Sequence, residues 1–173
     1  MKKRDLLLTG AAIIGGSWLL QTLRSPSLNI AIASDPDQQN KATKKYKVMK
    51  TEAEWKEILT PEQFNVLRKH GTERSFTSPL DKEYGKGTYY CAGCEQALFV
   101  SDTKFNSRTG WPSFFDPIDG AIATSVDKAL FMKRTEVHCS RCGGHLGHVF
   151  DDGPQPTGQR YCMNGVAMKF IPA

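Results

Sequence analysis

The apolar positions of this sequence divide it into a short helical part followed by a longer part rich in strands. In TEAEWKEIL, Thr51 and Glu54 have the spacing of a capping box, which predicts the start of a helix. The apolar residues Trp55, Ile58 and Leu59 then fall on one helical face. The pattern therefore predicts a short helix with one apolar face.

A second helix is predicted directly after the first, in TPEQFNVLRKHG. Its signals are a threonine cap, a proline at the first helical position, a glutamine three residues after the cap and a glycine terminator: Thr60, Pro61, Gln63 and Gly71. After this glycine the chain changes to short β-type segments divided by turn residues, namely GTYYC, ALFV, AIATSV, ALFMKR and GVAMKF. We therefore expect an α+β domain, mainly β, with short N-terminal helices followed by mostly antiparallel sheet.

The first 33 residues differ from the rest of the chain. A basic head, MKKRD, precedes an apolar run, and Ala31 and Ala33 form a small-residue cleavage pattern before Ser34. We interpret residues 1–33 as a secretory signal peptide. The alternative is an uncleaved membrane anchor through residues 6–23, although polar residues interrupt that run. Either form predicts export to the periplasm or an equivalent extracytoplasmic space.

Residues 34–48 are polar and lack periodicity, so we expect a linker before a folded domain at residues 49–173. The full chain has a formal net charge of +5, and residues 1–33 carry a net +3 of it, which leaves the rest near +2. This small charge gives no reason to expect nucleic acid or an anionic membrane as a partner. Nothing in the sequence indicates oligomerisation, so a monomer is the default expectation.

The five cysteines form two CxxC pairs and one single residue. Two CxxC turns can direct four thiolates at one ion, so we predict one structural zinc ion bound by Cys91, Cys94, Cys139 and Cys142. The alternatives are disulfide bonds, which export favours, and a thioredoxin-like redox centre. Neither pair stands at the start of a helix after a strand, and this disfavours the redox centre.

The fifth cysteine, Cys162 in RYCMN, has no CxxC partner. A leftover cysteine in an exported protein indicates a reactive thiol or an intermolecular bridge, although a cysteine near a terminal strand is often only a packing residue. Arg160 and Asn164 share its face if the segment is extended, and a nearby cation favours the thiolate. Cys162 is therefore a candidate nucleophile.

Other motifs contain residues that could complete an active site. HLGHVFDDG contains His145, His148 and Asp152, and TGWPSF contains Trp111, which is suited to lining a small apolar pocket. The histidines are also compatible with a metal site or a surface position, but a second metal is less economical if the CxxC sulfurs hold zinc. The combination of thiol, arginine, histidines, carboxylate and tryptophan in one domain favours catalysis over packing.

Four segments of the chain resemble the B-type methionine sulfoxide reductases, which act on the R epimer: GTYYCAGC, LFVSDTKFNSRTGWPSFFDPI, HCSRCGGHLGHVFDDGP and RYCMNGVAMKF. They run through residues 87–170, and the helical segment before them also fits the family. The resemblance implies an oxidoreductase that reduces methionine-R-sulfoxide, free or in proteins, to methionine and so repairs oxidised proteins. It also implies the family's fold of two antiparallel sheets with N-terminal helices, stapled by the structural zinc of zinc-containing members.

In this resemblance Cys162 is the nucleophile that attacks the sulfoxide sulfur, with Arg160 next to it. A thiolate and an acid must meet at the sulfoxide, because protonation of its oxygen makes the sulfur electrophilic. Methionine leaves and Cys162 becomes a sulfenic acid, which another thiol must reduce. Many members of the family carry a resolving cysteine two residues before the tryptophan of GWPSF, where this chain has Thr109. We therefore expect a one-cysteine cycle that uses an external thiol, such as a thioredoxin-like protein.

The resemblance implies roles for other residues of the same motifs. The group that orders water and protonates the departing oxygen would be His145, His148, Asp152 and Asn164. The pocket for the S-methyl group would be formed by Trp111 and Phe150, and the four CxxC cysteines would hold the zinc. The chain lacks GCFWG, the motif expected in reductases of the opposite epimer, so methionine-S-sulfoxide should be a poor substrate.

Two other functions are compatible with parts of this pattern. One is a zinc-stapled interaction module without catalysis, in which Cys162 is an unreactive packing residue. The other is an exported thiol–disulfide oxidoreductase that uses a CxxC pair, binds no zinc and remains active without Cys162. The zinc content and a Cys162→Ser variant would separate the three functions.

Overall fold

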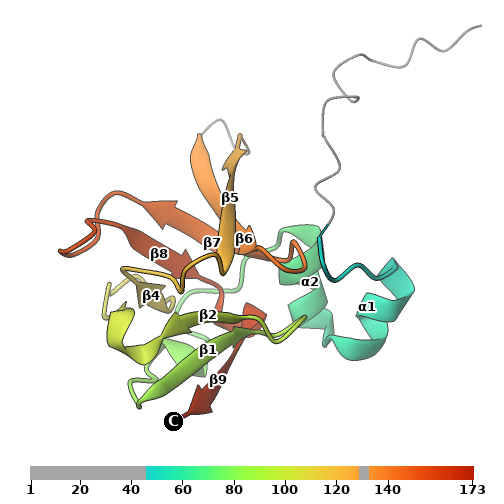
Figure 1. Ribbon diagram of the computed structural model, residues 1–173, viewed down its shortest axis with the longest axis horizontal. Coiled ribbons are helices and arrows are strands. Elements are labelled where there is room, and N and C mark those ends of the chain that lie inside the picture. Colours follow the sequence, from blue (N-terminus) through green and yellow to red (C-terminus); the bar gives the residue numbers. More distant parts are fainter. Residues whose placement is uncertain (1–45, 129–132) are drawn as a thin grey trace, which may run out of the picture. The chain divides into compact units, whose positions relative to one another are not determined.

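The computed structural model describes residues 46–128 and 133–173, so the predicted signal peptide or anchor at residues 1–33 lies outside the described residues. The described chain begins with two helices, α1 (Glu52–Ile58) and α2 (Pro61–Lys69), and continues as strands joined by loops and short 3-10 helices (Figure 1). No helix in this part of the chain is both long and apolar enough to cross a membrane.

The strands form two antiparallel sheets, which confirms the predicted fold class. The smaller sheet has the order β2-β1-β9, with strands Ala97–Val100, Gly87–Cys91 and Met168–Pro172. The larger sheet has the order β3-β4-β8-β7-β6-β5, and its strands are Lys104–Phe105, Ser113–Phe114, Arg160–Met163, His145–Phe150, Arg134–Cys139 and Ile122–Asp127. The 3-10 helices η2 (Pro79–Asp81), η3 (Ser101–Thr103) and η5 (Gly165–Ala167) lie between these elements.

Both predicted capping boxes are present. The backbone N–H of Thr51 donates to Glu54 Oε2 at 2.7 Å, and the N–H of Glu54 donates to Thr51 Oγ1 at 3.3 Å. The same exchange joins Thr60 and Gln63 at 3.1 and 3.2 Å. These bonds satisfy backbone amides that have no partner within the first turn of a helix.

The second helix ends two residues before the predicted terminator. α2 stops at Lys69, and His70, rather than Gly71, takes the left-handed conformation, with φ of 56°. Gly71 is needed for another reason, because a Cβ atom there would collide with the side chain of Asn65. A histidine therefore adopts the left-handed backbone conformation that glycine adopts most readily.

The two sheets are joined by a cluster of aromatic side chains in the core. Phe99 of β2 stacks on Phe114 of β4 with ring centroids 4.3 Å apart, and Tyr89 of β1 meets Phe114 edge-on at 4.8 Å. Leu146 of β7 and Met163 of β8 are fully buried in the same core. Because aromatic contacts add to the free energy of apolar burial, this cluster holds β4, β7 and β8 against the smaller sheet.

The sequence did not predict strands at β6 and β7, where the histidine motif lies. Burial along β7 does not alternate, since its first three residues are buried and its last three are half-buried. Gly147 interrupts the strand pattern, but a Cβ atom there would collide with the carbonyl of Cys162 on β8. The predicted segment ALFMKR lies partly outside the described residues, at positions 129–132, and its last residue begins β6.

Candidate active site

The two CxxC pairs come together in one cluster that links the two sheets. Cys91 ends β1 of the smaller sheet, Cys139 ends β6 of the larger sheet, and Cys94 and Cys142 lie on the turns that follow. All four Sγ atoms lie within 4.8 Å of one another, with 3.8 Å between Cys91 and Cys142 and 3.5 Å between Cys94 and Cys139. Each of these two contacts joins one CxxC turn to the other.

The sulfur spacing fits a tetrahedral metal site. Four sulfurs bound to one zinc ion at about 2.3 Å would lie about 3.8 Å apart, whereas a disulfide bond is about 2.05 Å long. All four cysteines are free thiols, three of them buried and Cys94 half-buried. The cluster could therefore hold a metal ion, and it stands at the ends of strands rather than at the start of a helix.

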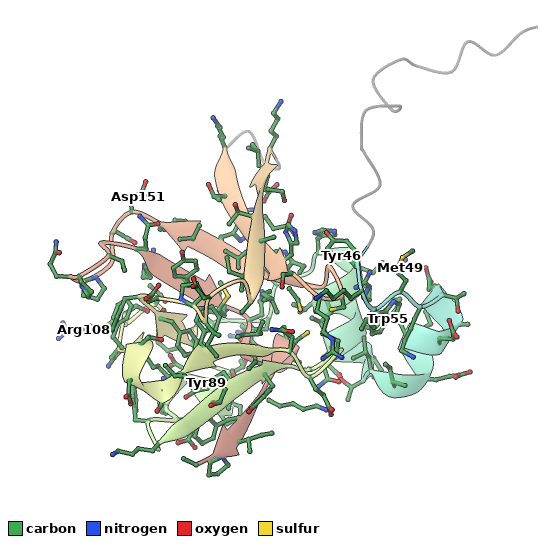
Figure 2. All side chains as sticks on the ribbon, viewed as in Figure 1. Tyr46, Met49, Trp55, Tyr89, Arg108 and Asp151 are labelled. Atoms are coloured by element: carbon green, nitrogen blue, oxygen red, sulfur yellow. The ribbon has the colours of Figure 1, made fainter. Side chains whose placement is uncertain are left out.

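The last residues of the predicted linker lie against this cluster. The ring of Tyr46, labelled in Figure 2, meets the ring of His138 edge-on, with 6.1 Å between the centroids. The backbone N–H of Val48 donates to the carbonyl of Arg141, on the second CxxC turn, at 3.0 Å. Residues 46–48 are therefore bound to the domain that follows them.

Cys162 lies within the larger sheet, on β8 between β4 and β7. Its Cα atom pairs with that of Ser113 on β4 and with that of His148 on β7. Arg160 lies two residues earlier on the same strand, so its side chain leaves the same face of the sheet, as the sequence predicted for an extended segment. The pairing thus fixes which neighbours Cys162 meets.

A small cavity of about 130 Å³ opens at the half-buried Cys162. Five of the predicted site residues line it: Trp111, His148, Phe150, Cys162 and Asn164. Thr72 and Arg134, which the sequence did not indicate, also line it, whereas His145, Asp152 and Arg160 do not. Most of the predicted site residues therefore line one cavity, and the other three lie outside it.

The pKa of the Cys162 thiol is set by opposing effects. Burial raises the pKa and is the largest of them, while the charge of Arg160 and hydrogen bonds from Thr109 and Arg160 lower it. The net direction is upward, so burial outweighs the guanidinium. Arg160 does favour the thiolate, as predicted, but near neutral pH the resting form of Cys162 is the thiol.

Arg160 is held by Asp152 rather than free beside the thiol. Its Nε and one terminal nitrogen donate to the two carboxylate oxygens of Asp152 at 2.8 and 2.9 Å. Its guanidinium also lies 4.5 Å from the centroid of the Phe150 ring. The hydrogen bonds from Arg160 lower the pKa of Asp152, so this exposed carboxyl is ionised and is not a proton donor.

His148 is supported by a carboxylate that the sequence did not indicate. Its Nε2 lies 2.9 Å from Asp127 Oδ2, and the same oxygen accepts a hydrogen bond from Arg134 at 2.7 Å. Burial lowers the pKa of His148, and the hydrogen bond to Asp127 only partly opposes this, so the ring is neutral near pH 7. A neutral imidazole that donates from Nε2 leaves Nδ1 as an acceptor.

His145 lies behind His148 and faces a neighbouring cavity of about 270 Å³, which both histidines line. The two rings meet edge-on with centroids 5.4 Å apart. His145 Nδ1 lies 2.7 Å from Glu136 Oε1, and His70 Nδ1 lies 2.9 Å from the same oxygen. Burial acts to raise the pKa of Glu136, but hydrogen bonds from His145 and Ser125 outweigh it and lower the pKa to about 2.

One further residue, Glu73, joins the walls of the site. Its backbone carbonyl accepts the indole N–H of Trp111 at 3.2 Å, and its backbone N–H donates to Asn164 Oδ1 at 2.9 Å. Asn164 Nδ2 in turn donates to the carbonyl of Leu146 at 2.9 Å. Both ends of the Asn164 amide are therefore engaged with the backbone, which suits it to positioning rather than proton transfer.

Thr109, which stands where a resolving cysteine is common, contacts the thiol directly. Its Oγ1 lies 4.0 Å from Cys162 Sγ. The same hydroxyl lies 2.8 Å from Ser107 Oγ, which lies 2.7 Å from Ser113 Oγ on β4. A chain of hydroxyls therefore leads from the thiol into the sheet.

The sequence matches the SelR domain family over residues 59–172. The peptide methionine sulfoxide reductase MsrB of Agrobacterium fabrum is 56% identical over 127 residues, which are 73% of this chain and 94% of that protein. The protein of the same name from Methanosarcina mazei is 58% identical over 125 residues, 72% of this chain and 89% of that one. This chain belongs to the methionine sulfoxide reductase B family.

Membership of the methionine sulfoxide reductase B family confirms the resemblance seen in the motifs and favours it over an interaction module or a CxxC oxidoreductase. Among solved structures, the Mis18 "Yippee-like" domain aligns over 51% of this chain and 97% of that one, with a TM-score of 0.42 and 14% identity. That likeness is too distant to carry a conclusion.

The sequence did not indicate the residues that orient the side chains of the site. Asp127, Glu136 and Arg134 flank the segment 129–132 and have no recognisable motif of their own. Glu73 lies in a loop after α2 and contributes both backbone groups and its carboxylate. Glu136 is a charged, half-buried residue within β6. Because the sequence did not predict this strand, no signal identified Glu136 either.

The pH dependence of Cys162 alkylation tests the opposing effects of burial and of Arg160 on the pKa of this thiol. We expect the rate of modification by iodoacetamide to rise through a midpoint above that of a free cysteine peptide, because burial raises the pKa of the thiol. Arg160→Met should move the midpoint higher, and Arg160→Lys, which retains the charge, should move it less. Mass spectrometry of samples quenched at each pH measures the rate. An unchanged midpoint in Arg160→Met would show that the guanidinium does not act on the thiol.

Proposed function

We propose that this protein reduces methionine-R-sulfoxide, free or in proteins, to methionine, with Cys162 as the nucleophile. The observation that carries the proposal is the cavity in which Cys162 meets His148, Trp111 and Phe150, in a chain of the methionine sulfoxide reductase B family. A sulfoxide needs a nucleophile at sulfur and a proton at oxygen, and this cavity offers both beside apolar walls. The protein is thus an oxidoreductase of protein repair.

The proposed reaction moves one oxygen atom from the substrate sulfur to Cys162. The thiol sulfur bonds to the sulfoxide sulfur. The oxygen then moves to the Cys162 sulfur as the substrate S–O bond and the new S–S bond break, and methionine leaves in reduced form. Cys162 retains the oxygen as a sulfenic acid, and the proton of the thiol ends on that oxygen. An external thiol then condenses with the sulfenic acid to give a mixed disulfide and water, and a second thiol reduces that disulfide.

His148 is the residue best placed to move the proton. It pairs with Cys162 across β7 and β8, lines the same cavity, and is oriented through Nε2 by Asp127. Because the resting thiol must lose its proton as it attacks, a neutral imidazole with a free acceptor nitrogen can take the proton and return it to the oxygen. His145 supports this ring from behind, and Asp127 is a positioning residue.

Asp152 and Asn164 serve in this scheme as positioning residues rather than as proton donors. Asp152 lies outside the cavity and orients Arg160, whose charge stabilises the thiolate as it forms. Asn164 lines the cavity, but its side-chain amide is hydrogen-bonded to the backbone of Glu73 and Leu146. A water molecule held at the oxygen would be ordered by His148, since His145 does not line this cavity.

The S-methyl group of the substrate is proposed to lie between Trp111 and Phe150. The Trp111 indole is anchored by its N–H, and the Phe150 ring is covered by the Arg160 guanidinium, so both apolar walls have fixed positions. A small cavity of about 130 Å³ suits the end of one side chain. Recognition of the R epimer rests on the family resemblance of these motifs.

A one-cysteine cycle is supported by the surroundings of the thiol. Thr109 occupies the position of the common resolving cysteine and touches Cys162, while the remaining cysteines lie together in their own cluster. We therefore propose that a sulfenic acid on Cys162 is reduced by an external thiol, such as a thioredoxin-like protein.

We propose that the four-cysteine cluster holds a single structural zinc ion. Closed thiolate sites of this kind stabilise folds because metal binding is coupled to folding, and here the ligands come from both sheets. All four ligand positions are taken by protein, so the ion has no part in the reaction.

We propose that the domain works outside the cytoplasm, either after removal of residues 1–33 or anchored by residues 6–23. The basic head, the apolar run and the Ala31-x-Ala33 pattern support export. The N-terminal sequence of protein recovered from the extracytoplasmic fraction distinguishes the cleaved form, which begins at Ser34, from the anchored one, and recovery from the cytoplasm alone would exclude export.

Stereospecific reduction is the direct test of the function. The reduced protein is incubated with a racemic methionine sulfoxide peptide and dithiothreitol, and chiral chromatography measures each remaining epimer. We expect loss of the R epimer alone, and a decrease of at least about 10³-fold in the rate for Cys162→Ser, since no nucleophile remains. Loss of the S epimer, or activity that survives in the variant, would contradict the proposal.

Thr109→Cys should convert the cycle from one cysteine to two. Because Thr109 Oγ1 lies 4.0 Å from Cys162 Sγ, a sulfur at this position can reach the sulfenic acid after a small movement. After one turnover without reductant, mass spectrometry should show the added oxygen in the parent protein but the loss of two hydrogens in the variant. Thr109→Ser, which keeps the hydroxyl, is the matched control. A variant that still accumulates the added oxygen would show that the two positions cannot meet.

Metal analysis of the purified protein tests the zinc site. We expect a single zinc ion per chain by inductively coupled plasma mass spectrometry, its loss in Cys139→Ser, and a lower melting temperature in that variant, because the link between the sheets is lost. Cys162→Ser should retain the zinc and serves as the control. Intramolecular disulfides at both CxxC pairs, without zinc, would overturn this assignment.

A further inference from the structure

A second cluster of metal-binding side chains lies beside the Cys162 cavity, where the end of α2 meets β6 and β7. It consists of His70, directly after α2, Glu136 on β6 and His145 on β7. One ligand atom from each lies within 4.8 Å of the other two. Both imidazole Nδ1 atoms approach the same carboxylate oxygen, Glu136 Oε1, at 2.9 and 2.7 Å.

We propose that His70, Glu136 and His145 form a binding site for a divalent transition-metal ion of the zinc and cobalt type, separate from the four-cysteine cluster. Two imidazoles and one carboxylate are the protein ligands of many open zinc sites. Ligands bound to one ion at about 2.0–2.1 Å lie about 3.3 Å apart in a tetrahedral site. The two N···O separations, 2.9 and 2.7 Å, are shorter than this value, so both imidazoles would have to move away from the Glu136 carboxylate by about half an ångström to admit an ion.

The cluster combines two largely buried side chains with one exposed side chain. The side chains of His145 and Glu136 are 3% and 13% exposed, whereas that of His70 is 66% exposed and is held by its contact with Glu136. Ser125 Oγ donates to the second carboxylate oxygen of Glu136 at 2.6 Å, an outer contact that orients the ligand. His145 Nε2 has no hydrogen-bond partner among residues 46–128 and 133–173, so the ring is anchored through the nitrogen that faces the cluster.

The surroundings leave room for the ion and for water. The three residues line the cavity of about 270 Å³, which also contains Asp127. Two cations, Lys128 and Arg134, line it as well, but Arg134 is paired with Asp127 at 2.7 Å, which offsets its charge. A site with three protein ligands beside an open cavity keeps coordination positions for solvent.

A metal ion bound at this site would affect the proposed reaction through its ligand His145. The His145 ring packs edge-on against His148, which lines the Cys162 cavity. An ion on His145 would place positive charge behind the imidazole that is to accept the thiol proton. We therefore expect bound metal to slow the reductase step, a consequence that rests on the proposed function, whereas the binding itself does not.

Cobalt binding tests the site without reference to activity. Co²⁺ is titrated into Cys162→Ser protein that carries one zinc ion per chain, so that the four-cysteine cluster is filled and the competing thiol is absent. Visible d–d absorption measures occupancy of the second site. We expect saturable binding at micromolar Co²⁺, weakened at least about tenfold by His70→Asn, since one of three ligands is lost. Asparagine tolerates the left-handed backbone of this position, so the fold should be retained. Lys69→Gln, one residue away, should bind as the parent does.

Two results would overturn the site: equal affinity in His70→Asn, or no saturable absorption below millimolar Co²⁺. The coupling to the reaction is tested separately, by the single-turnover rate of methionine formation without added thiols. Co²⁺ should slow the parent protein, and His70→Asn should remove most of this inhibition. Inhibition that persists in His70→Asn would place the inhibitory ion on Cys162 and exclude the coupling.

Discussion

The antiparallel pairing of β7 with β8 is the constraint on which the site depends. It sets Cys162 opposite His148 and leaves the neighbouring position of β7 without a side chain, because a Cβ atom on Gly147 would collide with the Cys162 carbonyl. A slip of one residue would exchange the faces of the two strands and separate the thiol from the imidazole. The register is held by core contacts made by Leu146 and Met163, one on each strand. Site geometry and core packing therefore depend on the same two strands.

The two clusters for which metal binding is proposed have different relations to this constraint. The four-cysteine cluster joins the end of β1 in one sheet to the end of β6 in the other and so ties the two sheets together. The cluster of His70, Glu136 and His145 joins α2 to the interior of the larger sheet, next to the reacting residues. The proposed zinc site is closed by four protein ligands, whereas the proposed second site is open and adjoins the cavity behind His148.

The sequence predicted those features that depend on local spacing or on specific motifs. A capping box depends on two residues that are three positions apart, so the helix starts at Thr51 and Thr60 could be predicted from the sequence. The CxxC spacing in the same way identified the four clustered cysteines. The strands β6 and β7 escaped prediction because burial on β7 does not alternate and its histidines and glycine are poor strand formers. Asp127, Glu136 and Glu73 act through contacts that depend on tertiary packing. The same holds for Asp152, whose position outside the cavity could not be known before its pairing with Arg160 was seen.

Glu73 gives the pocket a mechanical property that its individual contacts do not reveal. Its carbonyl holds the Trp111 indole, its N–H holds Asn164, and its carboxylate accepts the backbone N–H groups of Gly165 and Val166. One residue of an otherwise irregular loop is thus bonded to both walls of the cavity and to the segment that follows Cys162. The loop cannot swing away without breaking these bonds together, so the cavity keeps its shape when empty, and ligand binding loses little conformational entropy to ordering the protein.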